Sequence, residues 1–380
     1  MKYFIIAGEA SGDLHASNLM KELKAKDPQA DFCFLGGDLM AAQGGRQIKH
    51  YRDMAFMGIV NVAMNLRTVL RNIDDCKKAL KEYAPDVLIL IDYPSFNLRI
   101  AEFCKKEMPG TPVYYYISPK IWAWKEWRIK SIKKYIDKMY TILPFETEFY
   151  AKHDFKVDYV GNPCVDSVAW RENQDETKEQ FVLKNGLDER PIVALLAGSR
   201  MQEINGCLDK MIAVADSFKD YQFVLAAAPS IDKSVYDRII NGRDVKVLFG
   251  QTYDLLQHSR AAIVNSGTAT LETALLRVPE VVVYNVFGGR LANIAKKLVL
   301  KIKFVSLVNL IGGHEIVKEL IAADFTKENV KNELAKILPD TEERKTMLAE
   351  YDRIINLLGK PGVANKAAEH IIRDLKDSDK

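Results

Sequence analysis

Two acidic residues at the ends of apolar runs are the candidates for catalysis. Asp92 follows the run Val87–Ile91, and Glu9 follows the first apolar run of the chain. Ligands of open α/β sheets bind at the carboxyl ends of the strands. A partly desolvated carboxylate placed there can take a proton from an attacking hydroxyl group. Asp92 is therefore the first candidate for a general base and Glu9 the second, and the alternative for Asp92 is a cap on the helix that begins near Ser95.

The segment around Glu9 has the composition of a binding loop. Residues 7–13 read Ala-Gly-Glu-Ala-Ser-Gly-Asp and open a helix, so glycines permit a tight turn beside free N–H groups at the positive helix end. The segment is not Gly-x-Gly-x-x-Gly, and no Gly-Lys-Ser/Thr follows, which argues against a dinucleotide site and a P-loop. A tight turn in which Ser11 or Asp13 only caps a helix is the alternative. The residues expected at this cleft loop are Gly8, Ser11, Gly12, Asp13 and Asn97.

Two segments of the second half resemble phosphate sites. Residues 196–200, Leu-Ala-Gly-Ser-Arg, end an apolar run before a helix, and residues 265–272 repeat this design. Small residues at a helix N-terminus and an arginine can bind a diphosphate, and Glu272 can accept both hydroxyls of a ribose. A surface salt bridge of Arg200 and a cap by Thr268 are the alternatives. The residues expected to bind this nucleotide ligand, called the donor below, are Gly198, Ser199, Arg200, Glu203, Gln251, Ser266, Gly267, Thr268, Glu272 and Asn309.

An aromatic, basic strip and a Met-rich run are candidates for contact with lipid. Three tryptophans lie among lysines and arginines between residues 120 and 138, and the apolar run 54–66 precedes two arginines. Rings at a membrane interface with cations toward the headgroups have this composition, and a Met-rich surface suits acyl chains. Core packing and a solvated helix face are the alternatives. The expected lipid or membrane contacts are Met54, Phe56, Met57, Ile59, Val60, Arg67, Arg71, Trp122 and Trp124.

Composition excludes several classes of protein. The 54 Lys and Arg nearly balance the 51 Asp and Glu, which argues against a nucleic-acid partner. The five cysteines form no Cys-x-x-Cys pair and the six histidines no His-x-x-x-His, so we expect neither disulfides nor a metal site. No apolar run reaches the length of about 18 residues that a membrane span needs. We expect a cytoplasmic protein without cofactor or metal.

Alternating strands and helices must position these residues. Short β-branched or aromatic runs alternate with amphipathic stretches in both halves, which predicts parallel sheets covered by helices. The fold class expected is α/β, with two doubly wound Rossmann-like domains, a cleft between them and a helical C-terminus. Strands are expected at residues 3–7, 31–35, 86–91, 112–117, 139–143 and 158–160, and then at 192–197, 222–227, 245–248, 261–264 and 281–285.

Turn signals place the domain boundaries. The turn Gly161-Asn162-Pro163 and the polar stretch from Trp170 indicate a boundary near residue 165. The domains expected are residues 1–165, which would bind acceptor and lipid, and 166–340, which would bind a nucleotide-sugar. Beyond Gly313 we expect helices at residues 315–322, 326–337, 342–358 and 363–375. Residues 341–380 would brace the domains or form a homodimer.

Taken together, these motifs resemble the lipid A disaccharide synthases, inverting glycosyltransferases of family 19 with the GT-B fold. The matches run in order from residue 7 to about 322. They comprise residues 7–13, Met57-Gly58, residues 91–97, 116–124 and 143–146, Gly198-Ser199-Arg200, residues 266–272 and residues 305–310. The chain has Ser95 where the family often has Asp, which weakens any scheme with two carboxylates at that place.

The resemblance implies that UDP-2,3-diacylglucosamine and 2,3-diacylglucosamine 1-phosphate (lipid X) are joined into a disaccharide 1-phosphate, with UDP released. Asp92 would deprotonate the acceptor hydroxyl, while Arg200 and helix ends stabilise the leaving diphosphate without a metal. The substrates imply a protein associated peripherally with the cytoplasmic face of the inner membrane. A UDP-N-acetylglucosamine 2-epimerase and a non-catalytic lipid- or nucleotide-binding protein at the membrane are the alternatives.

Overall fold

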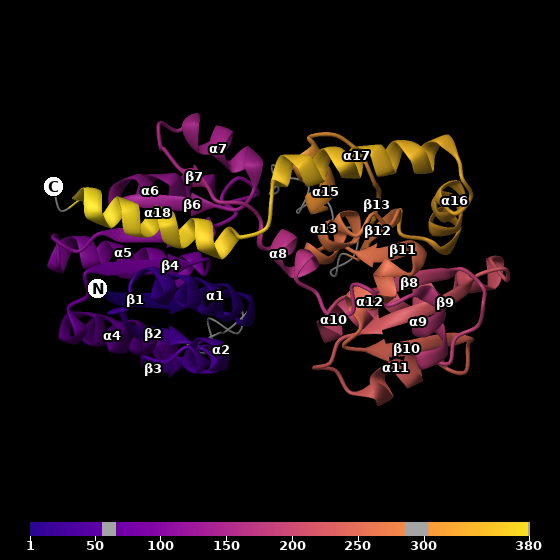
Figure 1. The fold of residues 1–380 in the computed structure, drawn as a ribbon, viewed down its shortest axis with the longest axis horizontal. Coiled ribbons are helices and arrows are strands. Elements are labelled where there is room, and N and C mark those ends of the chain that lie inside the picture. The colour runs from indigo at the N-terminus through magenta and orange to yellow at the C-terminus, as the bar shows by residue number, and fades with distance from the viewer. Residues whose placement is uncertain (55–65, 286–302, 379–380) are drawn as a thin grey trace. The chain divides into compact units, whose positions relative to one another are not determined.

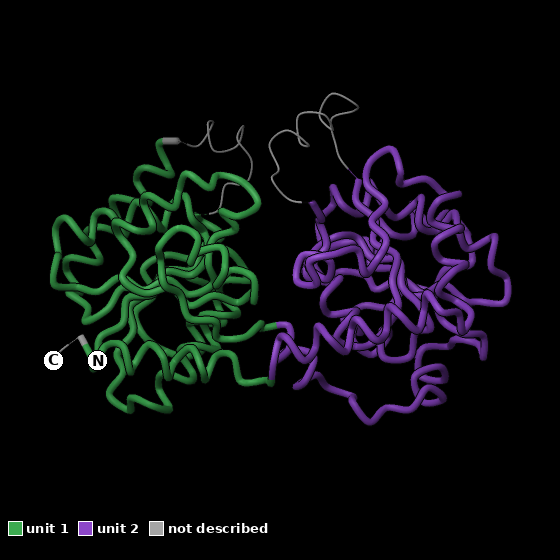
Figure 2. The backbone as a smooth tube through the Cα atoms, turned by 90° about the horizontal axis from the view of Figure 1, so that it is seen from above, with its two compact units in different colours: residues 1–163, 360–380 green, residues 164–359 purple. Residues whose placement is uncertain are grey.

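The computed structural model describes residues 1–54, 66–285 and 303–378 (Figure 1). The chain forms two compact units, residues 1–163 with 360–380 (unit 1) and residues 164–359 (unit 2), as Figure 2 shows. Four residues expected to contact lipid, Phe56, Met57, Ile59 and Val60, lie outside the described residues.

Unit 1 is built on a parallel sheet of strand order β3-β2-β1-β4-β5-β6-β7. Its central strands are buried on both faces, which explains why they are continuous apolar runs and not alternating patterns. The strands are β1 (Lys2–Ala7), β2 (Asp31–Gly36), β3 (Arg46–His50), β4 (Val87–Ile91), β5 (Val113–Tyr116), β6 (Lys138–Thr141) and β7 (Asp158–Tyr159). The helices are α1 (Ala10–Lys26), α2 (Asp38–Ala42), α4 (Leu66–Tyr83), α5 (Pro94–Glu107), α6 (Ile129–Tyr135), α7 (Pro144–Ala151) and α18 (Val363–Ser378).

Unit 2 repeats this architecture with the strand order β10-β9-β8-β11-β12-β13, again parallel throughout. The strands are β8 (Ile192–Leu196), β9 (Gln222–Ala227), β10 (Val245–Phe249), β11 (Ser259–Asn265), β12 (Glu280–Tyr284) and β13 (Lys318–Ile321). The helices are α9 (Lys178–Lys184), α10 (Met201–Ile212), α11 (Lys233–Ile240), α12 (Thr252–Gln257), α13 (Thr268–Leu275), α15 (Leu307–Gly312), α16 (Lys327–Ile337) and α17 (Glu342–Leu358). Helix α8 (Pro163–Ala169) lies at the boundary of the units.

Both sheets have the strand order of a doubly wound fold, so the predicted α/β class with two doubly wound domains is confirmed. Each predicted strand overlaps an observed one. The chain order reverses between β1 and β4 in the first sheet and between β8 and β11 in the second. Such a switch point is where open α/β sheets bind ligands. The register pairs Ala7 with Ile91 and Leu196 with Val264, so the loops that follow these strands leave each sheet side by side.

The predicted helix at residues 315–322 is wrong, because this segment contains strand β13, which pairs with β12. Residues such as Glu, Lys and Leu are good helix formers, but tertiary contacts override that preference here. The side-chain oxygen of Asn309 accepts hydrogen bonds from the N–H groups of Ile316 (2.7 Å) and Val317 (3.0 Å), which directs the chain into the strand. Strand β3 was also missed, because its polar sequence belongs to an exposed edge.

The C-terminal helices do not form the separate segment expected at residues 341–380. Helix α17 belongs to unit 2, whereas α18 returns to unit 1 and packs against α1 (Figure 1). Its apolar residues at helical spacing, among them Ala367 and Ile371, join the core that contains Ile5 and Ile89. The Tyr140 hydroxyl donates to the buried Asp374 carboxylate (3.0 Å). The last helix is therefore part of the core that supports the β1 and β4 loops.

We expect Ile371→Ala to destabilise unit 1 by about 2–4 kcal/mol, because the deletion leaves a cavity beneath the sheet. Ile371 is fully buried, whereas Leu357 on α17 is 45% exposed. Leu357→Ala is the matched control and should change stability little. Urea unfolding followed by circular dichroism measures both changes. Equal losses in the two variants would contradict a core role for α18.

Candidate functional site

Asp92 and Tyr93 follow β4 in an unusual backbone conformation. Both have positive φ, 41° and 47°, in the left-handed region that costs non-glycine residues about 1–3 kcal/mol each. Neighbouring side chains hold this turn. The Tyr115 hydroxyl and the Asn97 amide both donate to the Asp92 carbonyl oxygen, Asn97 at 2.7 Å. The turn places Asp92 at the carboxyl end of β4, beside the switch point of the sheet.

The Asp92 carboxyl group is suited to accept a proton. Burial raises its pKa above the ordinary value, although the charge of Lys120 and a hydrogen bond from the Tyr93 N–H act in the opposite direction. A carboxylate whose pKa is raised in this way binds a proton more readily than an exposed aspartate. The N-cap of α5 is Tyr93, and among the described residues that helix end has no side-chain cap. The capping alternative for Asp92 is therefore not supported.

Glu9 lies on the neighbouring loop, after β1. It is partly exposed. Burial raises the pKa of Tyr93, and the charge of Glu9 raises it further. Gly8 permits this close approach, since a Cβ atom there would lie 2.2 Å from Cδ1 of the Tyr93 ring. The two carboxyl candidates thus belong to one site, with Tyr93 close to both.

Two residues expected to bind a ligand at this loop, Asp13 and Asn97, have a structural role instead. Asp13 is 3% exposed, and its carboxylate accepts hydrogen bonds from the N–H groups of Gly37 (2.7 Å), Leu39 (3.1 Å) and Met40 (3.1 Å). It caps α2 and not its own helix. Asn97 is fully buried, so it acts through the backbone of Asp92. Ser11 is exposed, whereas Gly12 is buried against Ala7.

The donor-binding candidates surround a cavity of about 410 Å³ at the switch point of the second sheet. Eight of the ten expected residues line it, from Gly198, Ser199, Arg200 and Glu203 after β8 to Ser266, Gly267, Thr268 and Glu272 after β11. Asn265, from the expected segment 265–272, also lines the wall, and Thr252 and small residues at the end of β9 complete it. Thr252 and the β9 residues lie outside both expected loops, so no local motif marks them.

The two helix ends at this cavity differ. The Glu203 carboxylate accepts hydrogen bonds from the N–H groups of Ser199 (3.0 Å) and Arg200 (3.2 Å), so the two backbone donors that precede α10 are already occupied. Helix α13 begins after Gly267 and has no side-chain cap among the described residues. Its first N–H groups and its positive helix end therefore offer the better position for an anion. The Arg200 side chain, 63% exposed, forms an ion pair with Glu203 (3.3 Å), three residues further along the chain.

Glu272 joins this cavity to a neighbouring one of about 520 Å³. Burial raises the pKa of its carboxyl group, and the Tyr253 hydroxyl donates to it at 2.9 Å, which partly opposes that shift. The hydrogen bond fixes the side chain at the wall that both cavities share. Tyr253 was missed because it lies on α12, far from the motif in sequence.

Gln251 and Asn309 lie outside the walls of the donor cavity as the described residues define them. Gln251 exchanges hydrogen bonds with Asn185 (3.3 and 3.1 Å). Asn309 is fully buried, and it joins α15 to β13. We therefore assign both a supporting role instead of the expected donor contact. The Ser266 hydroxyl donates to the Val305 carbonyl oxygen (3.0 Å), which anchors the donor loop to the segment before α15.

The described lipid-contact candidates divide into buried and exposed residues. Met54 is 2% exposed and belongs to the core, so the expected lipid contact is wrong for it. The Trp122 indole donates to Glu146 (3.1 Å), a buried carboxyl group whose pKa burial raises to about 7. Trp124 is 45% exposed, with the Lys125 amine 3.9 Å from its ring centroid. Arg67 and Arg71 are exposed on α4.

The described residues contain neither a cluster suited to a metal ion nor a helix suited to span a membrane. Within residues 1–54, 66–285 and 303–378, no group of three His, Cys, Asp or Glu could hold a metal ion. Within the same ranges, no helix is both long and apolar enough to cross a membrane.

Comparison with known proteins supplies the family. The model of the lipid-A-disaccharide synthetase family matches residues 3–372. Two relatives named lipid-A-disaccharide synthase, from Syntrophus aciditrophicus and Myxococcus xanthus, are each 36% identical to the chain. The alignments cover 99% and 98% of this chain and 98% and 97% of those proteins.

Solved structures share the fold at low sequence identity. The glycotransferase of kitacinnamycin superposes with a TM-score of 0.66 at 13% identity, over 98% of this chain and 99% of that one. A UDP-GlcNAc 2-epimerase from Neisseria meningitidis, bound to UDP-GlcNAc, superposes with a TM-score of 0.61 at 14% identity, over 99% and 100%. At such identities the likeness shows the fold alone.

We expect Lys120→Met to raise the pKa of Asp92 further, because it removes the positive charge that favours the carboxylate. Carboxyl-carbon NMR titration of the protein measures the shift, with Asp92→Asn to assign the resonance. Lys130→Met, on the exposed face of α6, is the control with the same change of net charge. An equal shift of the Asp92 pKa in both variants would argue against a specific effect of Lys120.

Proposed function

Because the chain belongs to the lipid-A-disaccharide synthetase family, a family of glycosyltransferases of lipid A biosynthesis, we propose a specific reaction for it. The donor is UDP-2,3-diacylglucosamine and the acceptor is 2,3-diacylglucosamine 1-phosphate. The products are a β-1,6-linked disaccharide 1-phosphate and UDP. The observation that carries this proposal is the partly buried Asp92 carboxyl group at the switch point of unit 1, with a pKa raised by burial.

The donor nucleotide binds in the cavity of unit 2. Its diphosphate lies against the uncapped start of α13, where the helix end favours negative charge. Arg200 pairs with the diphosphate from the α10 side, exchanging its contact with Glu203 for one with phosphate oxygens. The Glu272 carboxylate, held by Tyr253, accepts hydrogen bonds from the ribose hydroxyls.

The transfer is a single displacement. The 6-hydroxyl oxygen of the acceptor forms a bond to C1 of the donor sugar while the bond from C1 to the diphosphate breaks. The hydroxyl proton passes to Asp92, and UDP leaves with the electron pair. One displacement inverts the configuration at C1. Glu9 is the second candidate for the proton acceptor, but the left-handed turn and the raised pKa favour Asp92.

The departing diphosphate requires positive charge, and residues of unit 2 provide it without a metal ion. Arg200 contributes a full charge, and the start of α13 contributes the partial charge of a helix N-terminus. Both belong to the walls of the donor cavity. We therefore propose a transfer that does not depend on a divalent cation.

The acylated substrates place the enzyme at the cytoplasmic face of the inner membrane. The exposed Trp124 ring lies next to the amine of the partly exposed Lys125, a pairing of aromatic ring and cation typical of a membrane interface. Arg67 and Arg71, exposed on α4, add positive charge in the same unit. These residues support peripheral binding to anionic lipid.

We expect the purified protein to form disaccharide 1-phosphate and UDP in equal amounts with EDTA present, as mass spectrometry would show. Asp92→Asn should lower kcat about 10²- to 10⁴-fold with UDP affinity unchanged, because it removes the proton acceptor alone. Arg200→Ala should weaken UDP binding about 10- to 100-fold, as expected for a lost charge-assisted contact. Near wild-type turnover of Asp92→Asn, combined with loss of turnover in Glu9→Gln, would transfer the role to Glu9.

We expect Trp124→Ala to weaken binding to vesicles of anionic phospholipid severalfold, because it removes an aromatic ring from the membrane interface. Cosedimentation with the vesicles measures the effect. Trp170→Ala is the control, since Trp170 is 65% exposed but lies in unit 2. If the control lost as much binding as Trp124→Ala, the strip would not be the membrane contact.

A further inference from the structure

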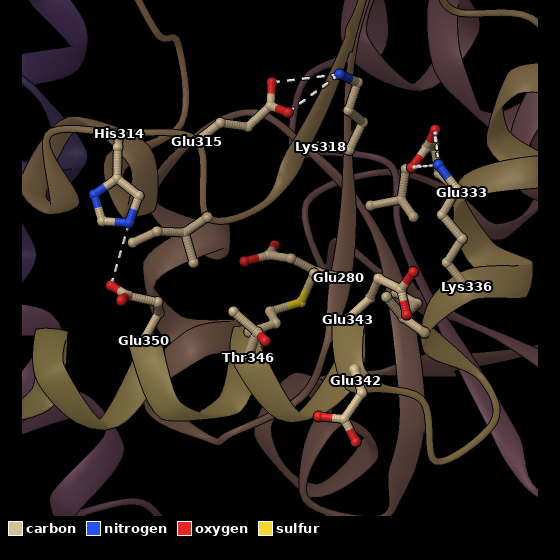
Figure 3. Close-up of a pocket in the computed structure, with 14 residues that line it drawn as sticks. Glu280, His314, Glu315, Lys318, Glu333, Lys336, Glu342, Glu343, Thr346 and Glu350 are labelled. Atoms are coloured by element: carbon tan, nitrogen blue, oxygen red, sulfur yellow. Dashed lines mark hydrogen bonds and ion pairs between the residues drawn. The ribbon is translucent and has the colours of Figure 1, made fainter.

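Unit 2 contains a further cavity, of about 500 Å³, whose lining residues are drawn in Figure 3. Its wall includes Glu280 and Val281 at the start of β12, Lys318 at the start of β13, and residues of α16 and α17. The donor cavity is formed at the carboxyl ends of β8 and β11, whereas this one is formed at the amino ends of β12 and β13. The proposed glycosyl transfer does not use it.

The wall of this cavity is strongly acidic. It contains six glutamates against two lysines. Ion pairs neutralise four of these glutamates: Glu315 with Lys318 (3.2 Å), Glu333 with Lys336 (2.8 Å), Glu342 with Lys345 (2.7 Å) and Glu350 with Arg353 (2.8 Å). For the other two, Glu280 and Glu343, the described residues supply no ion pair. Two carboxyl groups of the wall thus have no cationic partner among the described residues.

Glu280 is the unusual residue of the set. Its side chain is fully buried and points into the cavity, as Figure 3 shows. One carboxyl oxygen accepts a hydrogen bond from Tyr351 (3.4 Å), but the other, Oε2, has no hydrogen-bond partner among the described residues. A buried polar atom without a partner is rare and costs free energy. Burial and the nearby charge of Glu319 raise the pKa of Glu280, so a cation at Oε2 would stabilise its carboxylate.

The surface around the acids is apolar. Val281, Ile337 and Met347 line the cavity and are themselves buried. Helix α17 presents Glu343, Met347 and Glu350 at positions i, i+4 and i+7, so an apolar side chain lies between acids on one helix face. A ligand that fits this wall carries cationic groups separated by an aliphatic chain.

A metal ion does not match this arrangement. Metal sites need several ligands that converge on one point, and the described residues contain no such group of His, Cys, Asp or Glu. Glu280 lies at the start of β12, whereas Glu343 lies in the first turn of α17 and is exposed. An elongated organic cation can reach both positions.

We propose that this cavity binds an aliphatic diamine or polyamine. One ammonium group donates hydrogen bonds to Oε2 of Glu280, and a second ammonium group pairs with Glu343 at the mouth of the cavity. The methylene chain between them lies on Val281, Ile337 and Met347. This binding does not depend on the proposed sugar transfer.

The test is isothermal titration calorimetry of the full-length protein with cadaverine, spermidine and the monoamine pentylamine. We expect both polyvalent amines to bind, and Glu280→Gln to weaken them about tenfold or more, because a buried charge pair is lost. The glutamine can still accept the Tyr351 hydrogen bond, so the fold should be retained. Glu328→Gln, at an exposed position on α16, is the control with the same change of net charge and should bind as the wild type does.

Glu343→Gln tests whether the cavity binds two ammonium groups of one ligand or only attracts cations nonspecifically. It should weaken cadaverine severalfold and leave pentylamine unchanged, since the monoamine occupies only the inner end. Absence of binding by every amine at millimolar concentration would overturn the proposal. An equal loss in Glu328→Gln and Glu280→Gln would also overturn it, because nonspecific charge attraction would then explain the binding. Binding of Mg²⁺ that requires Glu280, in place of the amines, would contradict the assignment of an organic cation.

Discussion

The parallel pairing of β1 with β4 and of β8 with β11 is the constraint on which the rest depends. Each pairing occurs where the strand order reverses, so the two loops that follow are brought together without helices between them. In unit 1 those loops carry Glu9 and Asp92, and in unit 2 they lead to Arg200 and to helix α13, which carries Glu272. The backbone hydrogen bonds of the two sheets therefore position the candidate catalytic and binding residues. Contacts between side chains only adjust these positions.

The left-handed turn after β4 in unit 1 costs free energy, and the packing of the surrounding core must offset this cost. Two successive left-handed residues, Asp92 and Tyr93, are held by Tyr115 and Asn97, both buried. Burial also disfavours the charged form of Asp92, which is the property a general base needs. Helix α18 packs in the core on the other face of the sheet, which contains Ile91 at the end of β4, so residues near 371 help to stabilise the strand that precedes this turn.

The sequence predicts the central strands well, because strands buried on both faces appear as unbroken apolar runs, and glycines mark the binding loops. It does not reveal contacts that only the tertiary structure forms. Asp13 looks like a loop ligand but caps α2, and Asn309 looks like a donor contact but fixes the start of β13. The prediction of a helix at residues 315–322 was wrong for the same reason. Tyr253 and Lys120 approach the candidate acids from segments distant in sequence, and no local motif identifies them.

The central claim is that Asp92, and not Glu9, takes the proton during transfer. The most direct measurement is the pH dependence of kcat/KM for the wild type, Glu9→Gln and Asp92→Asn. The account predicts that wild-type activity falls as the pH drops through an apparent pKa above the ordinary 3.8 of aspartate, because only the carboxylate accepts the proton. Glu9→Gln should keep this acid limb, and the residual activity of Asp92→Asn should lack it. An acid limb that persists in Asp92→Asn and disappears in Glu9→Gln would contradict the claim.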